Sequence, residues 1–330
     1  MPIGSNLCLF FTIGRHIFNI THKYTKIVSL RLTKPVLFDI IKQRKYYTAF
    51  YAAFYGGKVL AKVILVTSFK GGVGKTTISA NLAMSFAKSG KKVIAVDCDL
   101  ESRCLDMVLG VEDLPLFNIC DAVGKKCGIE SAVTKYEESE NLFFMPAPAF
   151  YPEAVQDTDT SEIFTHDAVK DFIDALKKDY DYIILDLPAR PDSLYREAVK
   201  FASVIIVVSL HTATSIRAAE KTAIAVSELA GDKANPDIRL IINGFRADDV
   251  KNGENVGLYD IISKTHLPLL GVIPYDSDMV RAQEQGMLAE TYVPKLDFAK
   301  AIDNVAERLG GKNVKLLRGI KTGVKNKNIY

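Results

Sequence analysis

The chain has 330 residues, of which 48% are hydrophobic and 25% charged, and this ordinary globular composition excludes collagen-like and fully disordered proteins. The net charge of +3 hides an uneven distribution, because residues 1–62 carry +9 and residues 312–330 carry +6, which leaves −12 on residues 63–311. We therefore expect three parts: a basic, aromatic-rich and poorly ordered N-terminal extension over 1–62, a main domain over 63–311, and a basic C-terminal tail over 312–330.

Two apolar runs near the start are the longest candidates for membrane-spanning segments. They cover residues 7–14 and 46–57, and both fall short of the roughly 20 residues that a bilayer requires. The first run also precedes the positive charges, which is the reverse of the order in a secretory signal peptide. The five cysteines form no C-x-x-C pair, so neither a disulfide framework nor a zinc site is indicated. Together these features predict a cytoplasmic protein.

Short apolar runs alternate with amphipathic segments from Val63 onward. The runs are too apolar to have a solvated face, which is typical of strands buried in a parallel sheet. The segments between them are long enough to be crossover helices, so the pattern predicts an α/β fold with a doubly wound, mostly parallel sheet and helices on both faces. The expected strands are 63–67, 92–97, 142–146, 181–186, 203–209, 238–243 and 269–273, and the expected helices are 76–88, 165–178, 215–230, 255–265 and 298–309.

A glycine-rich loop follows the first expected strand and opens the first expected helix, which is the position of a phosphate-binding loop. Its glycines let backbone N–H groups turn toward phosphate oxygens, and the helix N-terminus adds partial positive charge. Lys75 is placed for the β- and γ-phosphates of a nucleotide and Thr76 for Mg²⁺. A plain strand-to-helix turn would not explain the Lys-Thr-Thr that follows the third glycine. The candidate binding residues are Lys70, Gly71, Gly72, Val73, Gly74, Lys75, Thr76 and Thr77.

The loop sequence Lys70-Gly-Gly-Val-Gly-Lys-Thr-Thr77 resembles the deviant Walker A motif of the MinD/ParA family of P-loop ATPases, with Phe69 in place of the first glycine of the strict motif. The resemblance implies ATP and Mg²⁺ as cofactors. It also implies catalytic roles for Lys75 and for Lys70, whose side chain would reach the nucleotide of a second subunit.

The resemblance continues at the ends of two later strands. The sequence Asp97-Cys-Asp99 resembles the switch I of this family, and Asp186-Leu-Pro-Ala189 resembles its switch II. An aspartate at a strand end is often only a helix cap, but three such residues after a phosphate-binding loop favour a functional role. The resemblance implies that Thr76, Asp97 and Asp186 hold the metal and that Asp99 is a catalytic residue that orients the attacking water.

Flanking residues favour the MinD branch of the family. The sequence after Asp99 lacks the Asp-Pro-Gln of ParA proteins, and residues 269–276 are similar to a MinD stretch. By the same resemblance, Asn243 and Pro274 would flank the adenine. Three residues near the two switches, Glu101, Cys104 and Arg190, differ from those of the family at the same positions. These differences weaken the prediction of γ-phosphate sensing more than the prediction of nucleotide binding.

The resemblance implies a switch ATPase that closes into an ATP-dependent homodimer, engages an anionic membrane surface and an activator or effector protein, and is released by hydrolysis, in spatial regulation of cell division. The protein would then be cytoplasmic and would bind the cytoplasmic face of the membrane as a peripheral protein. The tail would bind the membrane as a short amphipathic helix, with Val314, Leu317, Ile320 and Val324 at helical spacing, although Gly319 and Gly323 weaken that helix. A solvated basic tail is the alternative.

Two other functions stay open from the sequence. One is a ParA-type ATPase that partitions DNA and so has DNA as a partner, and the other is an FlhG-like regulator of flagellar placement. His211 follows an apolar strand and is expected to be an ordinary surface residue of a loop. Cys98 and Cys104 are expected to be small buried hydrophobic residues, because their surroundings do not match the cysteine motifs of the related nitrogenase iron protein.

Overall fold

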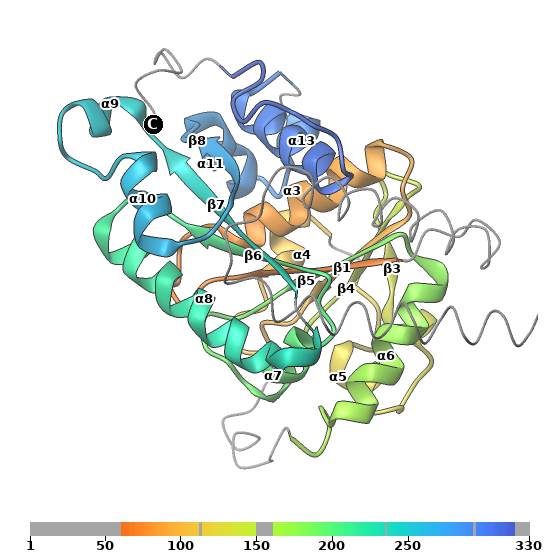
Figure 1. The fold of residues 1–330 in the computed structure, drawn as a ribbon. Coiled ribbons are helices and arrows are strands. Elements are labelled where there is room, and N and C mark those ends of the chain that lie inside the picture. Colours follow the sequence, from red (N-terminus) through yellow and green to blue (C-terminus); the bar gives the residue numbers. More distant parts are fainter. Residues whose placement is uncertain (1–60, 112–113, 150–160, 235, 293–294, 321–330) are drawn as a thin grey trace, which may run out of the picture. The chain divides into compact units, whose positions relative to one another are not determined.

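The structure is a computed structural model, and it describes residues 61–111, 114–149, 161–234, 236–292 and 295–320. These residues form an eight-stranded sheet in the order β3-β4-β2-β5-β1-β6-β7-β8 (Figure 1). All neighbouring strands pair in parallel except β3, which runs antiparallel to β4. The strands are β1 (Lys62–Thr67), β2 (Val93–Asp97), β3 (Thr134–Lys135), β4 (Leu142–Met145), β5 (Tyr182–Asp186), β6 (Val204–Ser209), β7 (Asp237–Phe245) and β8 (Leu269–Pro274).

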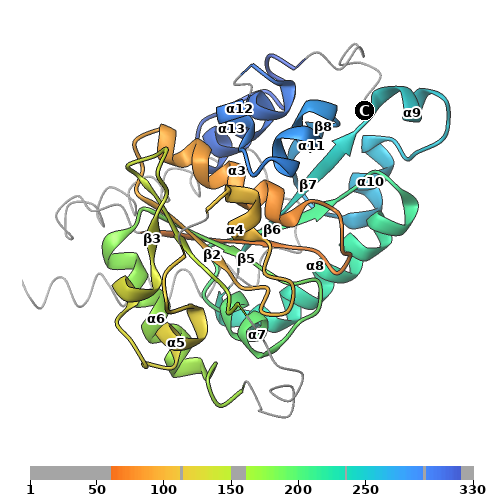
Figure 2. The same ribbon diagram turned by 180° about the vertical axis from the view of Figure 1, so that it is seen from behind.

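Helices cover both faces of the sheet, as the two opposite views show (Figures 1 and 2). One face carries α3 (Lys75–Lys88), α4 (Leu105–Leu109), α11 (Ser277–Glu284), α12 (Ala289–Tyr292) and α13 (Asp297–Leu309), which share one hydrophobic cluster. The other face carries α5 (Ile119–Val123), α6 (His166–Asp179), α7 (Ser193–Val199), α8 (Ala213–Ala234) and α10 (Leu258–Thr265). The short η1 (Ile129–Ala132) and α9 (Ala247–Lys251) lie in connections.

The predicted fold class is confirmed, and its physical basis is burial of the strands on both faces. Every residue of β2, β5 and β6 is buried, which only a sheet covered by helices on both sides permits. The predicted N-terminal extension lies outside the described residues, apart from Ala61 and Lys62. Because β1 begins at Lys62, the domain starts one residue before the predicted boundary. Among the described residues, no helix is both long and apolar enough to cross a membrane.

A register shift marks the last strand of the sheet. Leu240 pairs with Leu269 and Ile241 pairs with Gly271, so Leu270 is an extra residue on β8, as in a β-bulge. The carbonyl oxygen of Leu270 accepts a hydrogen bond from the guanidinium of Arg308 on α13. A Cβ on Gly271 would lie 2.5 Å from Cγ2 of Val305, so glycine is required for α13 to pack this closely.

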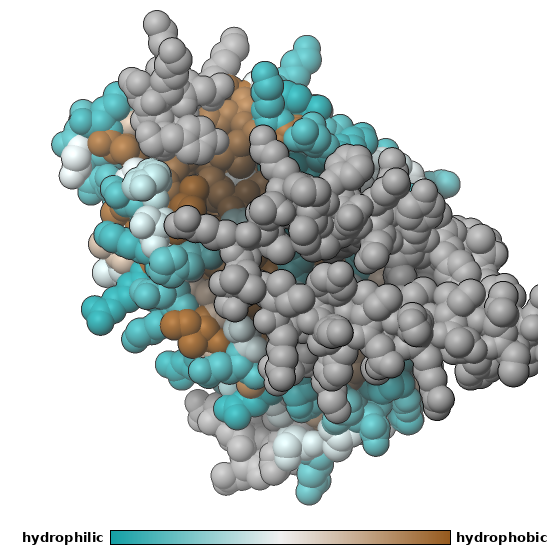
Figure 3. All heavy atoms as spheres, in the orientation of Figure 1, coloured by the Kyte–Doolittle hydropathy of each residue, from teal (hydrophilic) through white to brown (hydrophobic). Residues whose placement is uncertain are grey.

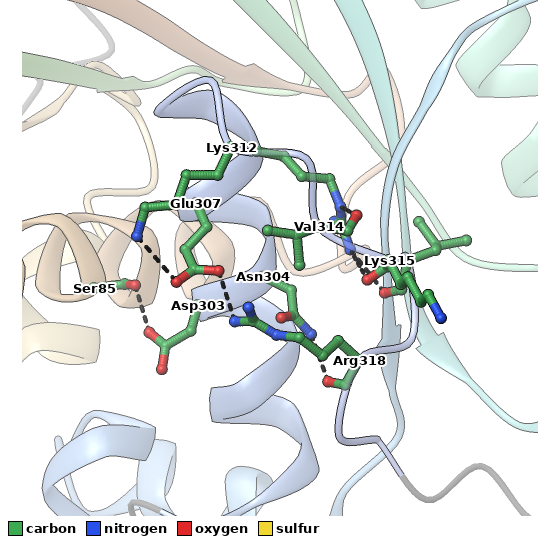
Figure 4. A network of polar contacts seen from close by, with 10 residues as sticks. Ser85, Asp303, Asn304, Glu307, Lys312, Val314, Lys315 and Arg318 are labelled. Atoms are coloured by element: carbon green, nitrogen blue, oxygen red, sulfur yellow. Dashed lines mark hydrogen bonds and ion pairs between the residues drawn. The ribbon is translucent and has the colours of Figure 1, made fainter.

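The segment after α13 folds back on the domain (Figure 4). The guanidinium of Arg308 donates to the carbonyl oxygens of Val314, Lys315 and Leu316 at 3.0, 3.0 and 2.8 Å. Arg318 forms an ion pair with Glu307 at 2.6 Å, and its carbonyl oxygen accepts from Nδ2 of Asn304 at 2.8 Å.

The predicted amphipathic helix of the tail is therefore wrong over residues 312–320, which contain no helix. Leu317 packs against the cluster around β7 and α10, and Ile320 packs against the cluster around α3 and α13, so the domain partly buries these side chains. The space-filling view shows apolar residues near β8, beside hydrophilic ones (Figure 3). Val324 lies outside the described residues.

Candidate nucleotide-binding site

The glycine-rich loop links β1 to α3 at the carboxyl edge of the sheet, as the sequence predicts. Gly72 and Gly74 have φ angles of 69° and 91°, a left-handed conformation that favours glycine. A Cβ on Gly74 would also lie 2.3 Å from Nδ2 of Asn243, whereas a Cβ on Gly71 or Gly72 would meet no atom within 4 Å. The loop therefore leaves open space beside Gly71 and Gly72, which fits a group bound by backbone N–H donors.

Asn243 joins this loop to the end of β7, although 170 residues separate the two in sequence. Its Nδ2 donates a hydrogen bond to the carbonyl oxygen of Val73 at 2.9 Å. Pro274 ends β8 and pairs in register with Phe245 on β7. Asn243 thus lies against the phosphate-binding loop, and the contact of Asn243 and Pro274 with adenine stays a prediction.

Two side chains near Pro274 were not identified from the sequence. The guanidinium of Arg246 lies 3.7 Å from the ring centroid of Tyr275, a cation–π contact between the ends of β7 and β8. The side chain of Tyr275 is exposed. No sequence motif identified this pair, because the contact depends on two strands that neighbour each other only in the folded sheet.

Two predicted metal-binding carboxylates lie directly opposite each other. Asp97 ends β2, Asp186 ends β5, and the two residues are partners in the strand register. Asp97 is fully buried, and its two oxygens accept from the backbone N–H groups of Asp99 and Leu105, each at 3.0 Å. Burial, and then the nearby charge of Asp186, raise the pKa of Asp97 to about 8.

Asp186 lies against the first turns of α3. Its Oδ1 accepts a hydrogen bond from Oγ of Ser79 at 2.8 Å, and the hydroxyl of Thr76 is near enough to favour the ionised carboxylate. Burial raises the pKa of Asp186 to about 6, although these two hydroxyls and the charge of Lys75 favour the ionised form. Two buried carboxylates beside a threonine hydroxyl are hard oxygen ligands whose charge a cation would balance, so the residues present fit Mg²⁺.

The predicted switch I begins at Asp97, the last residue of β2, and continues into the turn that follows. Oδ1 of Asp99 accepts from the backbone N–H of Ser102 at 3.0 Å, so the carboxylate of Asp99 is held by its own turn. Arg103 has a φ of 36° and donates from Nε to Oδ2 of Asp106 at 2.9 Å. Cys104 is exposed, which corrects the expectation that it is buried, while Cys98 is buried as expected.

Lys70 contacts residues of its own chain. Its Nζ donates to Oγ1 of Thr214 at 2.8 Å and to Oγ of Ser215 at 2.9 Å, both in the first turn of α8. In the same region Phe69 donates from its backbone N–H to Oγ1 of Thr222 at 3.0 Å. The loop is therefore attached to α8 on one side and to β7 on the other.

His211 is buried, with 4% of its surface exposed, so the prediction of a surface residue is wrong. Its Nε2 lies 3.7 Å from Oδ2 of Asp249, and its carbonyl oxygen accepts from the N–H of Val256. Burial lowers the pKa of His211 below its ordinary value, which favours a neutral ring.

A family model described as an AAA domain matches residues 61–240. The septum site-determining protein MinD of Helicobacter pylori is 32% identical over 259 residues, which cover 77% of this chain and 92% of that protein.

Two solved structures are also similar. The MinC:MinD cell division protein complex of Aquifex aeolicus contains a chain that is 29% identical with a TM-score of 0.67, and the match covers 78% of this chain and 98% of that one. The septum site-determining protein MinD of Pyrococcus horikoshii, complexed with Mg-ADP, is 27% identical with a TM-score of 0.64, and the match covers 76% and 96%.

Proposed function

This chain belongs to the MinD family of P-loop ATPases, and from that premise we propose that it is an ATP-driven switch that closes into a homodimer and takes part in the spatial control of cell division. The observation that carries the proposal is the arrangement at the carboxyl edge of the sheet. The glycine-rich loop and Thr76 lie beside the buried pair of Asp97 and Asp186. Such a site suits a nucleotide with its divalent cation.

The roles of the residues follow from this arrangement. The backbone of residues 71–75 would hold the phosphates, and Thr76 with Asp97 and Asp186 would hold Mg²⁺, directly or through water. When bound, Mg²⁺ neutralises phosphate charge. Asp99 is exposed enough to reach solvent and would orient the attacking water, while Lys75 would bind the phosphates.

Lys70 would act between two copies of the chain. In the single chain its ammonium group is bound to two neutral hydroxyls, those of Thr214 and Ser215, rather than to a carboxylate. Such bonds are weaker than an ion pair, so the ammonium could exchange them for a phosphate of a partner's nucleotide. Dimerisation would then be coupled to ATP.

A partner protein and a membrane surface complete the proposal. A MinD relative occurs in a complex with MinC, which supports an effector protein as a partner. Membrane binding would use the basic tail, and because Leu317 and Ile320 pack on the domain, their use as anchors requires residues 312–320 to leave it. Because residues 63–311 carry a net charge of −12, the excess of basic groups that could bind either an anionic membrane or DNA lies at the two ends of the chain, and the DNA-partitioning function stays the alternative.

Three substitutions in the full chain test the ATP switch. We expect Lys75→Ala to abolish ATP binding, and Asp99→Ala to keep binding and dimerisation but lose turnover. Lys70→Ala should bind ATP but neither dimerise nor hydrolyse it. Light scattering with ATP and Mg²⁺ gives the oligomeric state, and an Asp99→Ala protein that stays monomeric would contradict the dimer.

Membrane binding has its own test. Anionic liposomes should co-sediment more protein with ATP than with ADP. Truncation before residue 312 should abolish this binding. Equal binding by the truncated and the full chain would exclude the tail as the anchor.

A further inference from the structure

Ser79 lies one turn after Lys75 on α3 and points at a carboxylate of the neighbouring strand. It is fully buried, and its Oγ lies 2.8 Å from Oδ1 of Asp186 and 3.0 Å from the carbonyl oxygen of Lys75. A serine hydroxyl has one proton, and both of these neighbours are acceptors. The charged carboxylate is the stronger acceptor, so the proton is directed at Asp186.

Thr76 also lies near Asp186 and favours its ionised form, but the two hydroxyls differ in what else they can do. Thr76 is half-buried at the mouth of the loop, and its oxygen is a proposed ligand of Mg²⁺. Ser79 lies one turn further along α3, and its hydroxyl is already bonded to Asp186 and to the carbonyl oxygen of Lys75, so we do not place it among the ligands of the metal or the phosphates. Ser79 is therefore the hydrogen-bond donor that remains available to Asp186 alone when a metal and a nucleotide are bound.

We propose that Ser79 is a positioning residue for the metal: its hydroxyl fixes one oxygen of Asp186 so that the other stays oriented toward Mg²⁺. The inference rests on the proposed ATP- and Mg²⁺-binding function of this site. Because α3 carries both the loop residues and Ser79, one rigid helix sets the position of the nucleotide loop and of the switch II carboxylate. Ser79 does not contact the reacting atoms and acts only through Asp186.

The test separates metal binding from nucleotide binding. Binding of a fluorescent ATP analogue to the full chain is measured without Mg²⁺, in EDTA, and then as Mg²⁺ is titrated. We expect Ser79→Ala to raise the Mg²⁺ concentration at half-saturation roughly tenfold, the effect of losing one hydrogen bond to a charged group. Its affinity for the analogue in EDTA should stay within about twofold of the wild type.

Ser85 provides a matched control on the same helix. It is also buried, but its Oγ donates to Oδ1 of Asp303 on α13 at 2.5 Å, away from the candidate site (Figure 4). Ser85→Ala should lose stability as Ser79→Ala does and leave the Mg²⁺ midpoint unchanged. Ser79→Cys has nearly the volume of serine and a weak S–H donor, so its midpoint should lie between those of the wild type and Ser79→Ala.

The outcomes are distinct. A Ser79→Ala midpoint equal to that of Ser85→Ala would overturn the proposal, as would an equal loss of affinity with and without Mg²⁺. If Ser79→Ala does not fold, as judged by circular dichroism, Ser79→Cys takes its place, and a wild-type midpoint in that variant would overturn the proposal. A wild-type protein that binds the analogue without any effect of Mg²⁺ would instead contradict the proposed function.

Discussion

Gly110 and Gly286 meet backbone to backbone: a Cβ on Gly110 would lie 2.0 Å from the carbonyl oxygen of Gly286. Both have positive φ angles, 67° and 62°, and they follow the last turns of α4 and α11. The helix α11 also contacts α3, because Oγ1 of Thr77 donates to Oε1 of Gln283 at 2.8 Å. The end of α4, the helix after switch I, therefore contacts the turn that follows α11, and the helix of the phosphate-binding loop contacts α11 itself.

Substitution of Gly110 by alanine should destabilise the protein strongly. The left-handed conformation alone costs about 1–2 kcal/mol for a residue with a Cβ, and the clash with a backbone oxygen that cannot rotate away adds to that cost. We expect the free energy of unfolding to fall by about 3 kcal/mol or more, measured by urea denaturation. Gly253 is the control, since its φ is 75° but a Cβ there would meet no atom within 4 Å. Equal losses for Gly253→Ala and Gly110→Ala would show that the close contact is not the cause.

Removal of the Asn243 amide should weaken nucleotide binding. Asn243→Ala removes the hydrogen bond that fixes the carbonyl of Val73 and so loosens the loop. We expect a loss of about 1–2 kcal/mol in the binding free energy of ATP, or roughly tenfold in affinity, measured by fluorescence titration. Asn255→Ala is a suitable control, because Nδ2 of Asn255 donates to Asp249 instead. An unchanged affinity in Asn243→Ala would argue against a role for this bond.

The stability of the protein should depend on the protonation of Asp192, which caps the N-terminus of α7 by accepting from the N–H of Tyr195 at 2.7 Å. Burial raises its pKa from 3.8 to about 6. The folded state thus holds the proton more tightly than the unfolded state, and this stabilisation is full below pH 4 and is lost as the pH rises through 6.

Asp192→Asn removes the titration and keeps a good helix cap. Relative to this variant, the wild type should lose roughly 1–3 kcal/mol of unfolding free energy between pH 4 and pH 7 and no more above that. Thermal or urea unfolding at a series of pH values measures the difference. A constant difference across this range would contradict the expected titration.

Arg308 should contribute far more to stability than its exposed neighbour Lys312. Arg308→Ala leaves the carbonyl oxygens of Leu270 and Leu316 without their guanidinium donor, and we expect a loss of about 2–3 kcal/mol. Lys312 is 68% exposed in its side chain and pairs with Glu307 at 3.2 Å, so Lys312→Ala should cost less than about 1 kcal/mol. Chemical denaturation of the two variants side by side measures both costs, and similar losses would contradict the structural role of Arg308.

The fold could be predicted from the sequence because burial on both faces leaves a visible pattern. A strand such as 181–186 reads as a continuous apolar run, and it is β5. The short α4, α7 and α11 were not predicted, since five to eight residues show too little of a helical period, and the two residues of β3 are too few to show any pattern.

The parts of the candidate site that lie in a local sequence motif could be predicted. The parts that depend on packing between distant segments could not. Residues 70–77 are contiguous in sequence, so their motif alone predicts the phosphate-binding loop. The partnership of Ser79 with Asp186 spans 107 residues and exists only because α3 packs on β5. His211 was misplaced for the same reason: Phe245 and Asp249 lie against its ring, and the N–H of Val256, 45 residues later, binds its carbonyl oxygen.

The extra residue at Leu270 also affects the outer edge of the sheet. β8 is an outermost strand, and the free backbone groups of such a strand can template pairing with another chain and so lead to aggregation. The bulge interrupts the regular ladder there, and Arg308 both binds the carbonyl of Leu270 and holds residues 314–316 beside the strand. The segment after α13 thus makes this strand a poor template for intermolecular β-pairing, which favours solubility.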